Sequence, residues 1–136
     1  FNGKCKIGSG SRVFVANNAT LAFGNNFNIT SNGNIICNKS ITFGNDNLIS
    51  WHCTIMDSDQ HDILDNQGNK INNVKAVTFG DNVWCGCHVI AMKGCTIANN
   101  VVIGAGSCLR GVYKDSNVIV SGNPAVVTKR NVMWKE

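Results

Sequence analysis

Apolar or small residues recur along this chain at a strict spacing of six, which leaves few folds open to it. In the second half they are Phe79, Cys85, Ala91, Ile97, Ile103 and Leu109. An amphipathic helix would place such residues three and four apart, and a free strand would alternate every two. A period of six instead fits a short strand followed by a corner, with one inward-facing residue in each unit. The repeat therefore predicts an all-β chain.

Three six-residue units close a triangular coil of 18 residues. Stacked coils then pair the repeat residues, with Phe79 over Ile97, Cys85 over Ile103 and Ala91 over Leu109. The same register appears earlier in two blocks separated by a slip of two, namely Phe23, Ile29, Ile35 and Phe43, Ile49, Ile55. Each ladder buries its residues on the next coil, as in any solenoid. Pairs such as Gly24-Asn25, Asn25-Asn26 and Asn99-Asn100 supply the corner conformations that β-branched residues resist.

Two segments depart from the repeat. Residues 57–76 are polar and irregular, so we expect a loop that protrudes from the solenoid. Residues 118–136 lose the period, and we expect a short C-terminal element in which Met133 and Trp134 form an apolar anchor. A length of 136 residues predicts a single domain, and a first residue Phe1 suggests a piece of a slightly longer chain.

Composition excludes several functional classes. No window offers 18 consecutive apolar residues, so no membrane insertion is expected. A net charge of +4 is too weak to argue for nucleic acid, although the basic last third suits a phosphorylated ligand. Seven cysteines suggest a disulfide framework at first sight, but Cys85 and Cys108 fall on the apolar repeat. We therefore expect free, buried thiols and a cytoplasmic setting.

Three segments carry further motifs: Ser-Trp-His-Cys-Thr-Ile-Met-Asp-Ser-Asp-Gln-His at 50–61, Gly-Asp-Asn-Val-Trp-Cys-Gly-Cys at 80–87, and Ile-Gly-Ala-Gly-Ser at 103–107, later followed by Gly-Asn-Pro-Ala at 122–125. With the repeat, they resemble the hexapeptide-repeat O-acetyltransferases of the maltose, galactoside and capsular-polysaccharide type. The resemblance covers nearly the whole chain from about residue 20. It implies a left-handed parallel β-helix, a homotrimer, and acetyl-CoA as acyl donor, with no metal.

The Asp-x-Asp-x-His segment supplies the candidate base. A neutral imidazole removes a proton from a hydroxyl during acyl transfer, and His61 matches the histidine that does so in the family. The resemblance implies direct transfer to a sugar hydroxyl, from a capsule or O-antigen precursor, without an acyl-enzyme. Asp57 and Asp59 are expected to hold the imidazole tautomer or a sugar hydroxyl. A solvated histidine in an acidic loop is the alternative.

The resemblance also assigns residues to the acyl donor. Cys87 matches the residue at the thioester, where its backbone N–H would stabilise the oxyanion, and Ala105 matches the small residue beside the pantetheine arm. Trp84 is placed near the donor groove. The nucleotide would meet basic side chains, which we expect to be Arg110, Lys129 and Arg130. The alternatives are a corner-covering tryptophan, an acyl-cysteine at Cys87 and a solvated basic tail.

Rival functions stay open at this point. An amino-sugar N-acetyltransferase or a serine O-acetyltransferase would use the same core motifs. Zinc ligation by residues from 52–53 and 85–88, as in a metal-dependent lyase, is disfavoured because Cys85 faces inward. A non-catalytic β-helix scaffold would have no need of the Asp-x-Asp-x-His segment.

Overall fold

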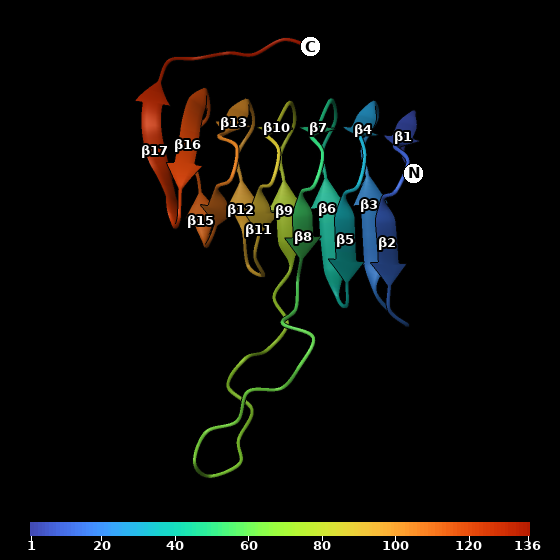
Figure 1. Ribbon diagram of the computed structural model, residues 1–136, viewed down its shortest axis with the longest axis vertical. Coiled ribbons are helices and arrows are strands. Elements are labelled where there is room, and N and C mark those ends of the chain that lie inside the picture. The colour runs from blue at the N-terminus through green and yellow to red at the C-terminus, as the bar shows by residue number, and fades with distance from the viewer.

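The computed structural model describes all 136 residues and contains strands but no helix. The strands are β1 (Cys5–Ile7), β2 (Arg12–Val15), β3 (Thr20–Phe23), β4 (Phe27–Ile29), β5 (Asn34–Cys37), β6 (Ser40–Phe43), β7 (Leu48–Ile49), β8 (Thr54–Met56), β9 (Val77–Phe79), β10 (Trp84–Cys85), β11 (Ile90–Ala91), β12 (Thr96–Ile97), β13 (Val101–Ile103), β14 (Cys108–Leu109), β15 (Val112–Tyr113), β16 (Val118–Gly122) and β17 (Ala125–Arg130). Figure 1 shows them as stacked coils from β1 to β17, with one long loop leaving between β8 and β9.

Every third strand joins the same sheet. Sheet A contains β1, β4, β7, β10, β13, β16 and β17, sheet B contains β2, β5, β8, β11 and β14, and sheet C contains β3, β6, β9, β12 and β15. All neighbouring strands pair in parallel except β16 and β17. Three parallel sheets that share each coil are consistent with the expected left-handed β-helix, and the all-β prediction is confirmed.

The strand registers follow the six-residue repeat. The predicted stacks are all present, as Phe79 over Ile97, Cys85 over Ile103 and Ala91 over Leu109. The slip of two is also confirmed, because Phe23 pairs with Phe43 and Ile29 with Ile49, 20 positions later. Repeat residues thus remain in contact although the length of the coil varies.

The protruding loop occupies the predicted residues. Strand β8 ends at Met56 and β9 begins at Val77, so residues 57–76 lie outside the sheets. Across this insertion Phe43 pairs with Phe79, and the repeat resumes in the same register. The insertion therefore adds a loop without disturbing the stack.

Asparagine carries the corners between sheets C and A. Asn26 and Asn100 adopt positive φ angles of 58° and 57°, as the corner pairs predict. Beside these residues, an Asn or Asp side-chain oxygen in each coil accepts a hydrogen bond from the backbone N–H of the equivalent residue in the preceding coil. Asn45 accepts from Asn25 at 2.9 Å, Asp81 accepts from Asn45 at 2.7 Å, and Asn99 accepts from Asp81 at 2.8 Å. This ladder satisfies backbone donors that the corners leave outside the sheets.

The core contains a second inward row that the repeat analysis did not identify. It lies two positions before each repeat residue and is buried at Val83, Val89, Cys95, Val101 and Ser107. Each coil therefore inserts two side chains per unit into the interior. A row of phenylalanines, Phe23, Phe27, Phe43 and Phe79, fills the wider early coils with ring centroids 4.4–5.5 Å apart.

The C-terminal element differs in part from its prediction. Strands β16 and β17 form an antiparallel hairpin, and residues 131–136 then run back across the coils (Figure 1). Trp134 is the anchor: its indole N–H donates to the Asn82 carbonyl at 2.8 Å, and its ring lies 5.8 Å from that of Trp84. Met133 was expected to join it, but this expectation is wrong, because Met133 is 77% exposed.

The cysteines agree with the prediction made from the sequence. All seven cysteines are free, and Cys85 and Cys108 are buried. No helix of the structure is long and apolar enough to cross a membrane.

Candidate functional site

The two acidic residues of the Asp-x-Asp-x-His segment face different surroundings. Asp57 is fully buried, and its carboxylate accepts the backbone N–H groups of Asn38, Lys39 and Ser40 at 2.7–2.8 Å. It therefore ties the start of the loop to the turn between β5 and β6. In this arrangement neither oxygen of Asp57 is presented to solvent.

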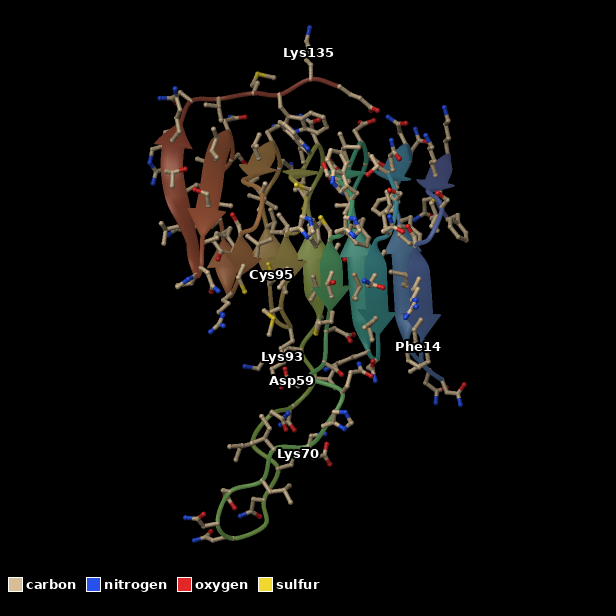
Figure 2. All side chains as sticks on the ribbon, viewed as in Figure 1. Phe14, Asp59, Lys70, Lys93, Cys95 and Lys135 are labelled. Carbon is tan, nitrogen blue, oxygen red and sulfur yellow. The ribbon has the colours of Figure 1, made fainter.

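Asp59 stands at the base of the loop with two partners. Its Oδ2 accepts from Lys93 Nζ at 2.5 Å and from Asn72 Nδ2 at 2.9 Å. These hydrogen bonds, that of Lys93 first, lower the pKa of the Asp59 carboxyl. Figure 2 shows Asp59 and Lys93 side by side where the loop leaves the prism. The Asp59 carboxylate is thus partly exposed, with 24% of its side chain accessible, unlike that of Asp57.

His61 follows on the outgoing arm of the loop and is exposed. Its backbone carbonyl accepts from Asn72 Nδ2 at 2.8 Å, whereas its imidazole makes no hydrogen bond within the chain. The loop beyond it is ordered, since Leu64 and Lys70 form an antiparallel bridge. An imidazole presented to solvent on a braced backbone is available to an incoming hydroxyl.

The predicted donor residues gather mainly around sheet A. Trp84 points outward from β10, is 37% exposed, and donates its indole N–H to Ser50 Oγ at 3.2 Å. Trp134 packs against it from the C-terminal segment. The ring is therefore held from two sides and offers one flat surface outward.

Cys87 and Ala105 occupy the same corner, between sheets A and B, in successive coils. The Gly106 N–H donates to the Cys87 carbonyl at 2.9 Å, whereas the backbone N–H groups of Cys87 and Ala105 donate to no group in the chain. The coils approach closely here, because a Cβ on Gly86 would lie 2.7 Å from the Ala105 nitrogen. Two free N–H donors beside a small side chain suit a thioester carbonyl.

The predicted nucleotide contacts are dispersed. Arg110 lies at the corner between sheets B and C, and Lys129 and Arg130 lie at the end of β17. Arg130 pairs with Asp115 at 3.0 Å in an exposed ion pair, and Arg110 and Lys129 make no ion pair. Because β17 runs antiparallel to β16, Lys129 and Arg130 lie beside the start of β16, whereas Ala105 lies beyond the end of the neighbouring strand β13. The five residues of β16 separate these two ends of sheet A by about 13 Å.

One chain does not bring the base and the donor residues together. The loop with His61 leaves from the corner between sheets B and C, whereas Cys87 and Ala105 lie at the corner between sheets A and B. Sheet B separates the two corners. The candidate site is therefore divided between two corners of the prism.

Sequence reasoning missed three residues that shape the site. Asn72 and Ser50 are polar and buried; no motif includes Asn72, and Ser50 begins the 50–61 segment without having been given a role. Lys93 was counted only as one of the basic residues in the last third, although its pairing with Asp59 spans 34 positions.

Histidine and cysteine do not converge on one point. His52 and His88 stack with ring centroids 4.9 Å apart, both at corner positions with positive φ. Cys85 is fully buried, and no group of three or more potential metal ligands is present. The two imidazoles occupy positions that asparagine or glycine holds in other coils.

Several curated relatives are similar in sequence, including three from Escherichia coli, while no family model matches the chain. A putative lipopolysaccharide biosynthesis O-acetyl transferase, WbbJ, from Escherichia coli K12 is 28% identical over 90% of the chain and 67% of the relative. The galactoside O-acetyltransferase of the same strain is 33% identical over 86% and 57%. A polysialic acid O-acetyltransferase from Escherichia coli O1:K1 is 35% identical over 92% and 38%. The chain thus spans between 38% and 67% of the length of these relatives.

Solved structures share the architecture. A maltose O-acetyltransferase from Clostridium difficile 630 superposes with a TM-score of 0.76 and 27% identity, over 93% of the chain and 66% of that protein. A galactoside acetyltransferase in complex with coenzyme A superposes with a TM-score of 0.73 and 24% identity, over 93% and 64%. The second likeness concerns the fold alone.

Proposed function

Because the chain belongs to the hexapeptide-repeat O-acetyltransferases, we propose that it transfers an acetyl group from acetyl-CoA to a sugar hydroxyl. The acceptor we propose is a surface-polysaccharide precursor of the capsule or O-antigen kind, met in the cytoplasm. Relatives named for lipopolysaccharide biosynthesis and for polysialic acid support this acceptor class. The observation that carries the proposal is His61, an exposed imidazole on a loop braced at its base.

In the proposed reaction His61 is the general base. Its neutral imidazole accepts the proton of the acceptor hydroxyl as the hydroxyl oxygen bonds to the thioester carbonyl carbon. The carbon–sulfur bond then breaks, and the imidazolium returns the proton to the departing thiolate. Acetyl group and proton are thereby exchanged between acceptor and donor, and the enzyme is unchanged.

The corner between sheets A and B suits the acyl donor. The free N–H groups of Cys87 and Ala105 are available to the carbonyl oxygen as it gains negative charge. Ala105 adds only a methyl group, so a pantetheine arm fits against the corner. We assign Arg110 and Lys129 to the nucleotide phosphates because neither is in an ion pair, although both lie at other corners of the prism than Ala105.

We assign the acceptor to Asp59 rather than to Asp57. Asp59 Oδ1 makes no hydrogen bond within the chain, so it can accept one from a sugar hydroxyl. The pKa of Asp59 is lowered, which keeps the carboxylate ionised at neutral pH. Both oxygens of Asp57 accept backbone N–H groups of the β5–β6 turn, so Asp57 fixes the start of the loop.

We propose that a homotrimer completes the site. The outward row of sheet A is apolar along four coils, at Leu48, Trp84, Val102 and Ile119. The outward row of sheet C is threonine in three successive coils, at Thr42, Thr78 and Thr96, and it ends in Ala22 and the exposed Val112. An apolar face suits burial against a second copy, whereas a threonine face suits solvent. A neighbour packed on sheet A brings its own His61 loop toward Trp84 and Cys87.

The deciding experiment compares the wild-type protein with His61→Ala. Thiol release from acetyl-CoA is followed with a panel of acceptors: a galactoside, an O-antigen oligosaccharide, polysialic acid, an amino sugar and serine. His61→Ala is expected to lower kcat by about 10³-fold, the usual contribution of a general base. Acetyl-CoA should raise the Tm of both proteins equally.

Three outcomes would overturn parts of the proposal. Unchanged turnover in His61→Ala would remove the base, and transfer to the amino sugar or serine alone would replace the acceptor class. Absence of any thermal shift with acetyl-CoA would favour a scaffold.

A further inference from the structure

A shielded ion pair fastens the projecting loop to the following coil. Lys93 lies in the corner between β11 and β12, and its ammonium group contacts Asp59 on the loop. The two side chains are only 19% and 24% exposed. Solvent screens such a pair less than it screens an ordinary surface pair.

Asn72 extends this contact across the loop. Its amide group donates to Asp59 Oδ2 at 2.9 Å and to the His61 carbonyl at 2.8 Å, and its oxygen accepts the Ile63 N–H at 2.7 Å. Asn72 is 9% exposed and belongs to the returning arm. The backbone is therefore held on both sides of His61.

We propose that Lys93 and Asn72 are positioning residues for His61, and that they form with Asp59 a brace that sets where the imidazole stands. The proposal rests on the proposed function for its catalytic consequence, but the placement of His61 is measurable without activity. No hydrogen bond within the chain restrains the imidazole itself, so its position depends on the braced backbone. A displacement of about 1 Å at a reacting group can cost 10²-fold in rate.

The rest of the loop offers a matched contrast. Lys70 pairs with Asp62 at 2.8 Å, but these side chains are 41% and 63% exposed and lie beyond His61 toward the tip. Figure 2 shows Lys70 farther out along the loop than Lys93. In both pairs the aspartate belongs to the protruding loop, but only the Lys93–Asp59 pair is part of the brace.

The coil that carries Lys93 does not depend on the brace. Its corner is closed by backbone hydrogen bonds, from Gly94 to Lys75 at 3.1 Å and from Cys95 to Met92 at 3.2 Å. A Lys93→Met variant keeps most of the side-chain length and loses only the charge. The prism should therefore fold normally in this variant.

The test compares Lys93→Met, Lys93→Arg and Lys70→Met by NMR and kinetics. The chain has three histidines, so His52 and His88 serve as internal references on the prism, and His61→Ala assigns the third imidazole signal. We expect Lys93→Met to shift or broaden the His61 signal and to speed exchange of the Ile63 amide by tenfold or more. The signals of His52 and His88 should not move. Lys93→Arg keeps the positive charge, so its His61 signal and its Ile63 exchange should stay close to those of wild type. Lys70→Met should resemble wild type.

The kinetic consequence separates positioning from plain stability. Lys93→Met should lower kcat by about 10–100-fold with an unchanged KM for acetyl-CoA, because Cys87 and Ala105 lie at another corner and Arg110 makes no hydrogen bond or ion pair with the brace. Asn72→Ala should act in the same direction. An unchanged His61 signal and Ile63 exchange in both variants would overturn the brace. If the His61 signal broadens in these variants while kcat stays within twofold of the wild-type value, the positioning role of Lys93 and Asn72 would be overturned.

Failure of the proposed function gives a different pattern. A wild-type protein that transfers no acetyl group to any acceptor would refute the function. The NMR comparison would then still decide whether Lys93 and Asn72 place His61.

Discussion

At the residue scale, two aspartates of one motif have separate tasks. Asp57 and Asp59 lie two positions apart, but one faces the interior and the other the base of the loop. Asp57 satisfies three backbone donors that the β5–β6 turn leaves unpaired. The motif therefore combines a support for the fold with a residue for the site.

Asp57→Ala should destabilise the whole chain by about 3 kcal/mol, since it leaves partly buried N–H groups without acceptors. Urea unfolding at neutral pH measures this loss, and Asp62→Ala is the control because its carboxylate is exposed. Equal stability of the two variants would contradict the structural role of Asp57.

The thiols differ in reactivity by their place in the coils. Burial raises the pKa of Cys53 to about 11 and that of Cys95 to about 12, and it also raises the pKa of Cys85. Only Cys5 and Cys87 are partly exposed. Iodoacetamide should therefore modify Cys87 and Cys5 in the native protein and all seven thiols after unfolding. Mass spectrometry of the labelled peptides checks this, and early labelling of Cys85 would contradict the inward row.

At the scale of elements, the stacks could be predicted because they depend on spacing alone. A residue such as Cys85 meets Ile103 whatever lies between them, provided that the coil has 18 residues. The contact between Lys93 and Asp59 could not be found this way, since it depends on how a loop outside the repeat turns back. Met133 was misplaced for a similar reason: only one face of the C-terminal segment meets the prism.

Glycine matters most where coils approach closely. A methyl group on Gly86 would meet the Ala105 backbone at 2.7 Å, whereas nothing lies within 4 Å of one on Gly106, whose φ is +73°. Gly86→Ala should cost roughly 1–3 kcal/mol by overpacking and should move the corner. Gly106→Ala should cost about 1 kcal/mol through backbone conformation alone.

Affinity for acetyl-CoA distinguishes the two glycine variants. Gly86→Ala should weaken donor binding, because it displaces the free N–H groups of Cys87 and Ala105. Gly106→Ala is the matched control for stability, measured by urea unfolding, and affinity is measured by calorimetry. Wild-type affinity in Gly86→Ala would argue against a donor site at this corner.

At the scale of the whole molecule, the candidate site is divided between two corners, and the proposed homotrimer would bring the two parts together. Sheet B separates the His61 loop from Cys87 and Ala105 within one chain. The repeat predicted the coils but not this division, because it gives no information on which corner each motif occupies. The loop follows β8 in sheet B, whereas the donor motifs follow β10 and β13 in sheet A.

Complementation between two inactive variants tests the shared site. His61→Ala lacks the base, and Ala105→Trp blocks the donor corner with a large side chain at an exposed position. If each site combines His61 of one chain with Ala105 of its neighbour, co-expressed variants should regain about a quarter of wild-type activity, because half of the chains supply each intact part. Each variant alone should stay inactive, and thermal unfolding checks that both fold. No recovery in mixed oligomers, with their composition verified by native mass spectrometry, would show that base and donor residues act within one chain.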